Sequence, residues 1–177
     1  LETAKQYGLL PRLHADEFVD SGASELAYNI NAVSADHLMA ISEKGINLLS
    51  KGNVIATLLP ATTLFLGKHN YANGRKLIDS GIDVAIATDF NPGSSTLCSI
   101  TWAMTLSMLY CGLTVEEVFK GVTWNAAKSI KKEKNIGRID KGYNADLLFW
   151  DIDNIDEIPY WLGAHRIEHV MKNGKII

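Results

Sequence analysis

The sequence predicts an α/β fold in which a parallel sheet is followed by a small β appendage. Four apolar segments of strand length alternate with helical segments as far as Cys111, and they comprise residues 9–14, 32–37, 54–59 and 82–88. Short strands that alternate with helices imply one parallel sheet with right-handed crossovers. After Asn135 the sequence changes to turns and strands, with Asn173-Gly174 as a typical hairpin turn. We therefore predict two parts, residues 1–134 and residues 135–177.

Helices are predicted from hydrophobic period, capping residues and glycine stops. Thr114 and Glu117 have the spacing of a capping box, so a helix is expected to start there and continue to Gly121. The segment from Thr96 to Tyr110 is apolar on nearly every side, which predicts a helix buried on both faces. The other expected helices are 1–8, 21–29, 38–49, 73–80 and 123–130, with a loop over 61–68 because Pro60 stops the third strand.

Composition narrows the class of protein and of partner. The chain has 177 residues, of which 47% are hydrophobic and 21% are charged, which is enough for a packed core. A net charge of −3 without a basic cluster argues against nucleic acid or an anionic membrane as partner, and no apolar run is long enough for a membrane span. Cys98 and Cys111 lie roughly 20 Å apart on one predicted helix, which is too far for a disulfide. Two reduced thiols predict a cytoplasmic location.

Polar residues follow three of the four predicted strands. They are His14 with Glu17, Asp36 with His37, and Asp89 with Asn91. Because the carboxyl ends of strands in a parallel barrel converge on one face, these residues are expected to lie together. Histidine and aspartate are suitable ligands for Zn²⁺ or Fe, and a second histidine and a glutamate beside them could move protons or hold substrate.

Each of these residues also has a structural interpretation. Asp36 can cap a helix that begins at His37, and an isolated histidine such as His14 is more often a hydrogen-bonded strand-end residue than a ligand. Gly93 and Ser94 can serve only a turn and a helix cap. The occurrence of three similar strand ends is what favours a functional site.

Three segments together resemble the fifth, sixth and eighth strand ends of the imidazolonepropionases, a family of the amidohydrolase superfamily. They are His14-Ala15-Asp16-Glu17, the segment Ser34 to Leu38, and the segment Thr88 to Ser94. Asn125-Ala126-Ala127 and residues 137–147 resemble the general carboxyl-terminal signature of the superfamily. The resemblance covers the whole chain and implies that residues 1–134 are the C-terminal half of a TIM-like (β/α)8 metal-dependent hydrolase barrel, with residues 135–177 as part of its β-sandwich appendage.

The resemblance implies hydrolysis of 4-imidazolone-5-propanoate to N-formimidoyl-L-glutamate, a step of histidine breakdown. His14 and Asp89 would bind one Zn or Fe ion, and Asp89 would also accept the proton of the attacking water. Glu17 would contact the substrate ring and move protons, while His37 would polarise the carbonyl or orient the water. The substrate's propionate end would be held by Asn91, Gly93 and Ser94, because N–H groups of a glycine turn at a helix N-terminus attract a carboxylate.

The sequence also departs from the family pattern. The family's His-x-His metal ligands and its substrate-binding Arg and Tyr come from its N-terminal half, and no His-x-His occurs in this sequence. We therefore expect a fragment that is inactive alone, and we expect self-association because a half-barrel exposes sheet edges. Two other interpretations remain open, namely another amidohydrolase such as a cytosine or guanine deaminase, and a non-catalytic structural fragment.

Overall fold

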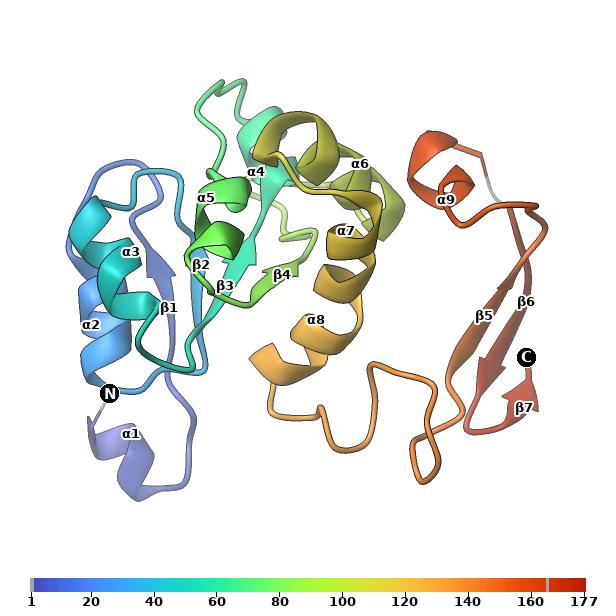
Figure 1. The fold of residues 1–177 in the computed structure, drawn as a ribbon, viewed down its shortest axis with the longest axis horizontal. Helices are drawn as coiled ribbons and strands as arrows, with labels where there is room; N and C mark the ends of the chain where they lie inside the picture. The colour runs from blue at the N-terminus through green and yellow to red at the C-terminus, as the bar shows by residue number, and fades with distance from the viewer. Residues whose placement is uncertain (1, 165) are drawn as a thin grey trace.

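A four-stranded parallel sheet organises the larger part of the molecule, on the left in Figure 1. The computed structural model describes residues 2–164 and 166–177. The strands are β1 (Arg12–Ala15), β2 (Ser34–His37), β3 (Ile55–Leu58) and β4 (Val84–Ile86), and they lie in the order β1-β2-β3-β4. Each strand pairs in parallel with its neighbour in the sequence, so the parallel sheet expected from the alternating pattern is confirmed, in the order that the resemblance to a (β/α)8 barrel implied. Among the described residues β1 and β4 have one strand partner each, so both edges of this sheet are open.

Seven of the described helices lie where the sequence predicted a helix, two of them starting later than expected, whereas α4 and α9 were not predicted. The described helices are α1 (Glu2–Gln6), α2 (Ala23–Asn29), α3 (Glu43–Leu49), α4 (Pro60–Phe65), α5 (Gly74–Asp79), α6 (Ile100–Cys111), α7 (Val115–Val122), α8 (Trp124–Ser129) and α9 (Glu157–Tyr160). The expected capping box of α7 is present, with Thr114 and Glu117 bonding each other's backbone N–H groups.

The expected loop over 61–68 is wrong, because α4 occupies most of it. Pro60 ends a strand, but its fixed φ and missing N–H group also suit the first turn of a helix. The helix expected from 38 begins only at Glu43, after its cap Ser42. The helix expected from Thr96 begins only at Ile100, after the turn that joins Asn91 to Ser95.

The core lies between the sheet and the helices. Small and apolar strand residues, among them Ala15, Ala35, Ala56 and Val84, are buried in one cluster with helix residues such as Val118. The alternation of side chains along a strand places Arg12, His14 and Asp36 on the opposite face of the sheet. There the Arg12 guanidinium lies 3.4 Å from the Asp36 carboxylate. The sheet thus has an apolar outer face toward the helices and a polar inner face.

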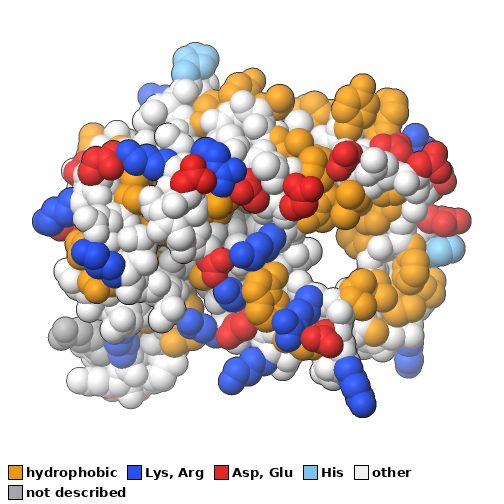
Figure 2. All heavy atoms as spheres, viewed as in Figure 1, with side chains coloured by type: hydrophobic (Ala, Val, Ile, Leu, Met, Phe, Trp, Pro, Cys, Tyr) orange, Lys and Arg blue, Asp and Glu red, His pale blue; other side chains and the backbone are white. Residues whose placement is uncertain are grey.

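The β appendage is a three-stranded antiparallel sheet of β5 (Leu147–Trp150), β6 (Ile167–Lys172) and β7 (Lys175–Ile176). The predicted Asn173-Gly174 turn is confirmed, with both residues at positive φ between β6 and β7. Helix α9 contacts α6, where the Thr105 hydroxyl donates to the carbonyl of Pro159. Figure 2 shows hydrophobic side chains gathered over α9 and this sheet, beside an opening between the appendage and α8. No described helix is both long and apolar enough to span a membrane.

Candidate metal and catalytic site

The residues that the sequence singled out line one hollow at the carboxyl ends of the parallel strands. This hollow has a volume of about 310 Å³, near the lower limit for small-molecule sites. It is lined by His14, Glu17, His37, Asp89, Asn91 and Ser94. Gly93, which the structure also describes, does not line it. The predicted convergence of three strand ends is therefore present in the structure.

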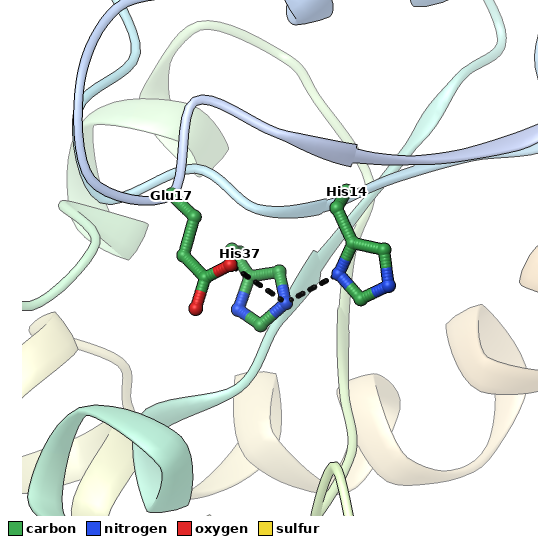
Figure 3. A group of neighbouring side chains, drawn as sticks. All are labelled: His14, Glu17 and His37. Carbon is green, nitrogen blue, oxygen red and sulfur yellow. Dashed lines mark hydrogen bonds and ion pairs between the residues drawn. The ribbon is translucent and has the colours of Figure 1, made fainter. Parts of the chain in front are cut away.

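The inner part of the hollow is formed by His14, Glu17 and His37 (Figure 3). His14 Nδ1 lies 2.8 Å from His37 Nε2, and His37 Nε2 lies 3.7 Å from a Glu17 carboxylate oxygen. One ligand atom from each of the three residues lies within 4.8 Å of the other two. Two imidazole nitrogens and a carboxylate are a donor set that suits Zn²⁺ or Fe, so the residues present fit the metal that the sequence predicted.

His37 reaches His14 only because the backbone leaves the strand conformation at this point. In the ladder His37 pairs with Ala15 and Asp36 pairs with His14, so strict alternation would place His37 on the core face. Instead His37 has φ 82° and Leu38 has φ 65°. Left-handed backbone at residues other than glycine costs about 1–3 kcal/mol each and is concentrated at functional sites. Here it turns the His37 ring toward His14.

The surroundings of His37 favour its neutral form. The side chain is only 2% exposed. Burial lowers the pKa of His37, the carboxylates of Glu17 and Asp89 raise it, and the net result is a pKa below the ordinary value. A neutral imidazole donates one hydrogen bond and accepts another, which suits a group that orients water or polarises a carbonyl.

Asp16, to which the sequence analysis assigned no role, holds the loop that carries Glu17. Its buried carboxylate accepts hydrogen bonds from the Ser21 N–H (2.9 Å) and hydroxyl (2.9 Å), and from the N–H groups of Ala23 (3.1 Å) and Ser24 (3.1 Å). It thereby caps α2, whose N-cap residue Gly22 has no side chain to do so. Asp16 therefore has a structural role, whereas its neighbour Glu17 lines the hollow. The spacing of these residues in the sequence does not reveal this difference.

Asp89 lines the same hollow but is outside the group of three close ligand atoms. Its backbone is left-handed, with φ 52°. The Asn91 amide nitrogen donates to its carbonyl oxygen at 2.7 Å. Asp89 therefore faces the same space as His14 and His37, as expected for strand ends on one rim.

The turn after Asp89 differs from the predicted carboxylate-binding turn. The Asn91 side-chain oxygen accepts from the N–H groups of Gly93 (2.9 Å) and Ser94 (2.8 Å), so these donors are satisfied within the turn. The turn is also not at a helix N-terminus, because α6 starts at Ile100. The expectation that free N–H groups of this turn would attract a carboxylate is therefore wrong, because the Gly93 and Ser94 N–H groups are already bonded to Asn91.

A second hollow, of about 360 Å³, lies at the opposite end of the strands. Its charged residues include Asp83 and Lys128, which form an ion pair at 2.5 Å. In parallel barrels, residues at the amino-terminal end of the strands contribute mainly to stability, and the catalytic residues lie at the carboxyl end. The smaller hollow, with its histidines and carboxylates, is the better candidate for a site.

Comparisons with known proteins agree with this geometry. A sequence profile of the amidohydrolase family matches residues 15–177. The imidazolonepropionase of Bacillus velezensis is 44% identical over 177 residues, which is all of this chain and 42% of that protein. The imidazolonepropionase of Bacillus thuringiensis is 45% identical over 173 residues, which is 98% of this chain and 41% of that protein. The chain therefore spans less than half the length of these relatives.

Solved structures show the same fold at low sequence identity. A zinc-bound adenosine deaminase from Xanthomonas campestris superposes with a TM-score of 0.82 at 18% identity, over 99% of this chain and 46% of that chain. A 5-methylcytosine deaminase from Klebsiella pneumoniae, liganded with 5-fluorocytosine, gives 0.81 at 20% identity, over 99% and 49%. The predicted fold class, an α/β half of a (β/α)8 amidohydrolase barrel with a small β appendage, is confirmed.

The role of Asp16 gives a prediction for stability. Burial raises the pKa of Asp16, but hydrogen bonds from Ser24 and Ser21 outweigh this effect and leave the pKa below its usual value. We expect Asp16→Asn to lower the free energy of unfolding by about 2 kcal/mol at neutral pH, the scale of hydrogen bonds to a charged group. Because the folded-state pKa is lowered, this contribution is present above the ordinary pKa of about 3.9 and disappears as the pH falls through the lowered value.

Urea unfolding of both proteins between pH 7 and pH 2 would measure this difference. Asp20→Asn is the control, since exposed Asp20 in the same loop accepts one long hydrogen bond from the described residues, from the Gly22 N–H at 3.2 Å. It should change stability by less than about 0.5 kcal/mol. Equal losses in the two variants, or a loss in Asp16→Asn that does not shrink in acid, would contradict the role given to Asp16.

Proposed function

This chain belongs to the amidohydrolase family, and we propose that it is the carboxyl-terminal part of a metal-dependent hydrolase that opens the ring of 4-imidazolone-5-propanoate to give N-formimidoyl-L-glutamate. The observation that carries this proposal is the convergence of His14, Glu17, His37 and Asp89 on one hollow. The 44–45% identity to imidazolonepropionases over essentially the whole chain supports the choice of substrate.

The metal would be a single Zn or Fe ion, held on this chain by His14 and Asp89. His14 is one of the three residues whose ligand atoms already lie close together, and Asp89 lines the same hollow. When bound, such an ion lowers the pKa of water and polarises a carbonyl.

The remaining groups are placed for the movement of protons. In the reaction a water oxygen bonds to the ring carbonyl carbon, the carbon–nitrogen bond breaks, and the leaving nitrogen takes a proton. We assign Asp89 to accept the proton of the water, and Glu17 to contact the ring and pass a proton to the nitrogen. Neutral His37 donates a hydrogen bond to the carbonyl oxygen or orients the water.

For the substrate's propionate end we keep Asn91, Gly93 and Ser94 as the proposed contacts. Asn91 and Ser94 line the hollow, and Gly93 lies between them in the turn. The Gly93 and Ser94 N–H groups are bonded to Asn91 Oδ1, and the Asn91 side-chain NH2 group donates to the Asp89 carbonyl oxygen and to Ser94 Oγ. Recognition through this turn would therefore rely on the Ser94 hydroxyl hydrogen, whose present contact with Asn91 Oδ1 is long, at 3.2 Å.

The chain holds only part of the catalytic site that this activity requires. His14 and Asp89 are two of the four protein ligands that the family resemblance implies. We therefore propose that the chain alone does not turn over the substrate and that other parts of the barrel complete the site.

Self-association is a further part of the proposal. Both edge strands of the parallel sheet have one unpaired side among the described residues, and unpaired edges favour association. Five large apolar side chains that flank β1 in the sequence are more than half exposed, and they are Tyr7, Leu9, Leu10, Phe18 and Val19. Pairing of two half-barrels would cover such surface.

A chimeric enzyme tests the proposed activity. This chain would replace the matching segment of the Bacillus velezensis imidazolonepropionase, and loss of 4-imidazolone-5-propanoate would be followed by absorbance. We expect turnover by the chimera and none by the chain alone. In the chimera, Asp89→Asn should lower kcat by about 10³-fold, the scale of a lost general base.

Asp153→Asn is the matched control, because Asp153 is an exposed carboxylate in the appendage. It should leave turnover unchanged. A folded, zinc-loaded chimera that leaves the imidazolone intact would contradict the proposal. Release of ammonia from cytosine or guanine by that same chimera would favour a deaminase instead.

Sedimentation velocity tests self-association. We expect the chain to form dimers or larger species as its concentration rises, and Val19→Lys should weaken this association by placing a charge beside β1. Ile139→Lys is the control, because Ile139 is also largely exposed (86%, against 68% for Val19) but lies in the segment that precedes β5. A monomer at all concentrations would contradict the proposed pairing.

A further inference from the structure

Asp89 receives a hydrogen bond from a residue that lies outside every motif considered above. The Thr62 hydroxyl donates to Asp89 Oδ2 at 2.6 Å. This is a short, charge-assisted contact between residues 27 positions apart in the sequence. Among the described residues it is the only hydrogen bond to the Asp89 carboxylate, so Oδ1 remains available to the hollow.

Thr62 is held rigidly in place. It lies in α4, which starts directly after β3 with Pro60 in its first turn. The Thr62 side chain is completely buried, and the Thr62 N–H donates to the Leu59 carbonyl oxygen at 3.1 Å. A buried hydroxyl on a short, packed helix cannot follow the carboxylate if the carboxylate moves, so it defines one orientation for Asp89.

Asp89 needs such a restraint because it lies outside regular structure. Strand β4 ends at Ile86, and Asp89 follows with left-handed backbone. Asn91 holds the Asp89 main chain through the carbonyl oxygen, and Thr62 holds the side chain. The two contacts together fix the direction in which the free carboxylate oxygen points.

We propose that Thr62 is a positioning residue for the reaction, which orients the Asp89 carboxylate toward the ion and the water. This inference rests on the proposed function, in which Asp89 binds the ion and accepts the proton. Residues that orient a metal ligand by hydrogen bonding typically change metal affinity by about 10–100-fold when they are replaced.

Three variants of the chain separate positioning from packing. Thr62→Val keeps the shape of the side chain and removes the hydroxyl, whereas Thr62→Ser keeps the hydroxyl. Thr63→Val is the matched control, because Thr63 is the next residue of α4, is equally buried, and directs its hydroxyl to Met39 Sδ at 2.9 Å. Zinc affinity would be measured by calorimetry, and a crystal structure of each protein would give the position of Asp89.

We expect Thr62→Val to weaken zinc binding by at least about tenfold and to release Asp89 from its position. Thr62→Ser and Thr63→Val should bind zinc within about twofold of the original chain, with Asp89 in place. Unchanged zinc binding and an unmoved Asp89 in Thr62→Val would overturn the inference.

If the unaltered chain bound no zinc, the metal site of the proposed function would fail, and the position of Asp89 in Thr62→Val would still decide the role of Thr62. An Asp89 carboxylate that moves in Thr62→Val but not in Thr62→Ser or Thr63→Val would support it. A carboxylate that moves equally in Thr63→Val would contradict it, because packing would then be the cause.

Discussion

The site depends on left-handed backbone at residues that ordinarily avoid it. Asp16, His37 and Asp89 each have positive φ, and each stands at the end of one of the parallel strands or shortly after it. A regular strand end would send successive side chains to alternate faces, so the histidines of β1 and β2 would not meet. The strained turns bring them together at 2.8 Å.

Each strained turn is held by hydrogen bonds that a regular loop would not need. The Leu38 N–H donates to the Ala15 carbonyl at 3.0 Å, and the Ala40 N–H donates to the Asp16 carbonyl at 2.8 Å, which ties the turn after β2 to the turn after β1. The Asp16 carboxylate accepts hydrogen bonds from the loop that follows it, and the Asn91 side chain donates to the Asp89 carbonyl oxygen. The conformational cost at the rim is thus offset locally, while the alanine-rich outer face of the sheet packs against the helices without strain.

Much of the fold could be predicted from the sequence, because it follows from the spacing of apolar residues and from helix-capping and turn residues. The four strands, their parallel order, the capping box at Thr114 and the hairpin turn at Asn173-Gly174 are all confirmed. Helix α4 was missed because Pro60 was interpreted only as the end of a strand, although it also suits the start of a helix. The start of α6 was placed four residues too early, because the apolar character of the segment does not show where a helix begins.

The residue types of the candidate site and its location at the carboxyl ends of the strands could be predicted from the sequence. The hydrogen bonds that support the site could not. Parallel topology alone requires that His14, His37 and Asp89 lie at one edge of the sheet. No rule of spacing indicates that Asp16 caps α2 while its neighbour Glu17 faces the hollow, or that Thr62 reaches Asp89 across 27 positions. Such contacts depend on the tertiary fold. The direction of His37 also depends on two φ angles that favour glycine, although the sequence has histidine and leucine there.

The central claim is that these strand ends form one metal site, and anomalous diffraction from a zinc-soaked crystal of this chain tests it most directly. We expect one strong zinc peak in the hollow, within bonding distance of a His14 ring nitrogen and of an Asp89 carboxylate oxygen. Zinc bound only at exposed histidines such as His69 or His169, with none in the hollow, would contradict it.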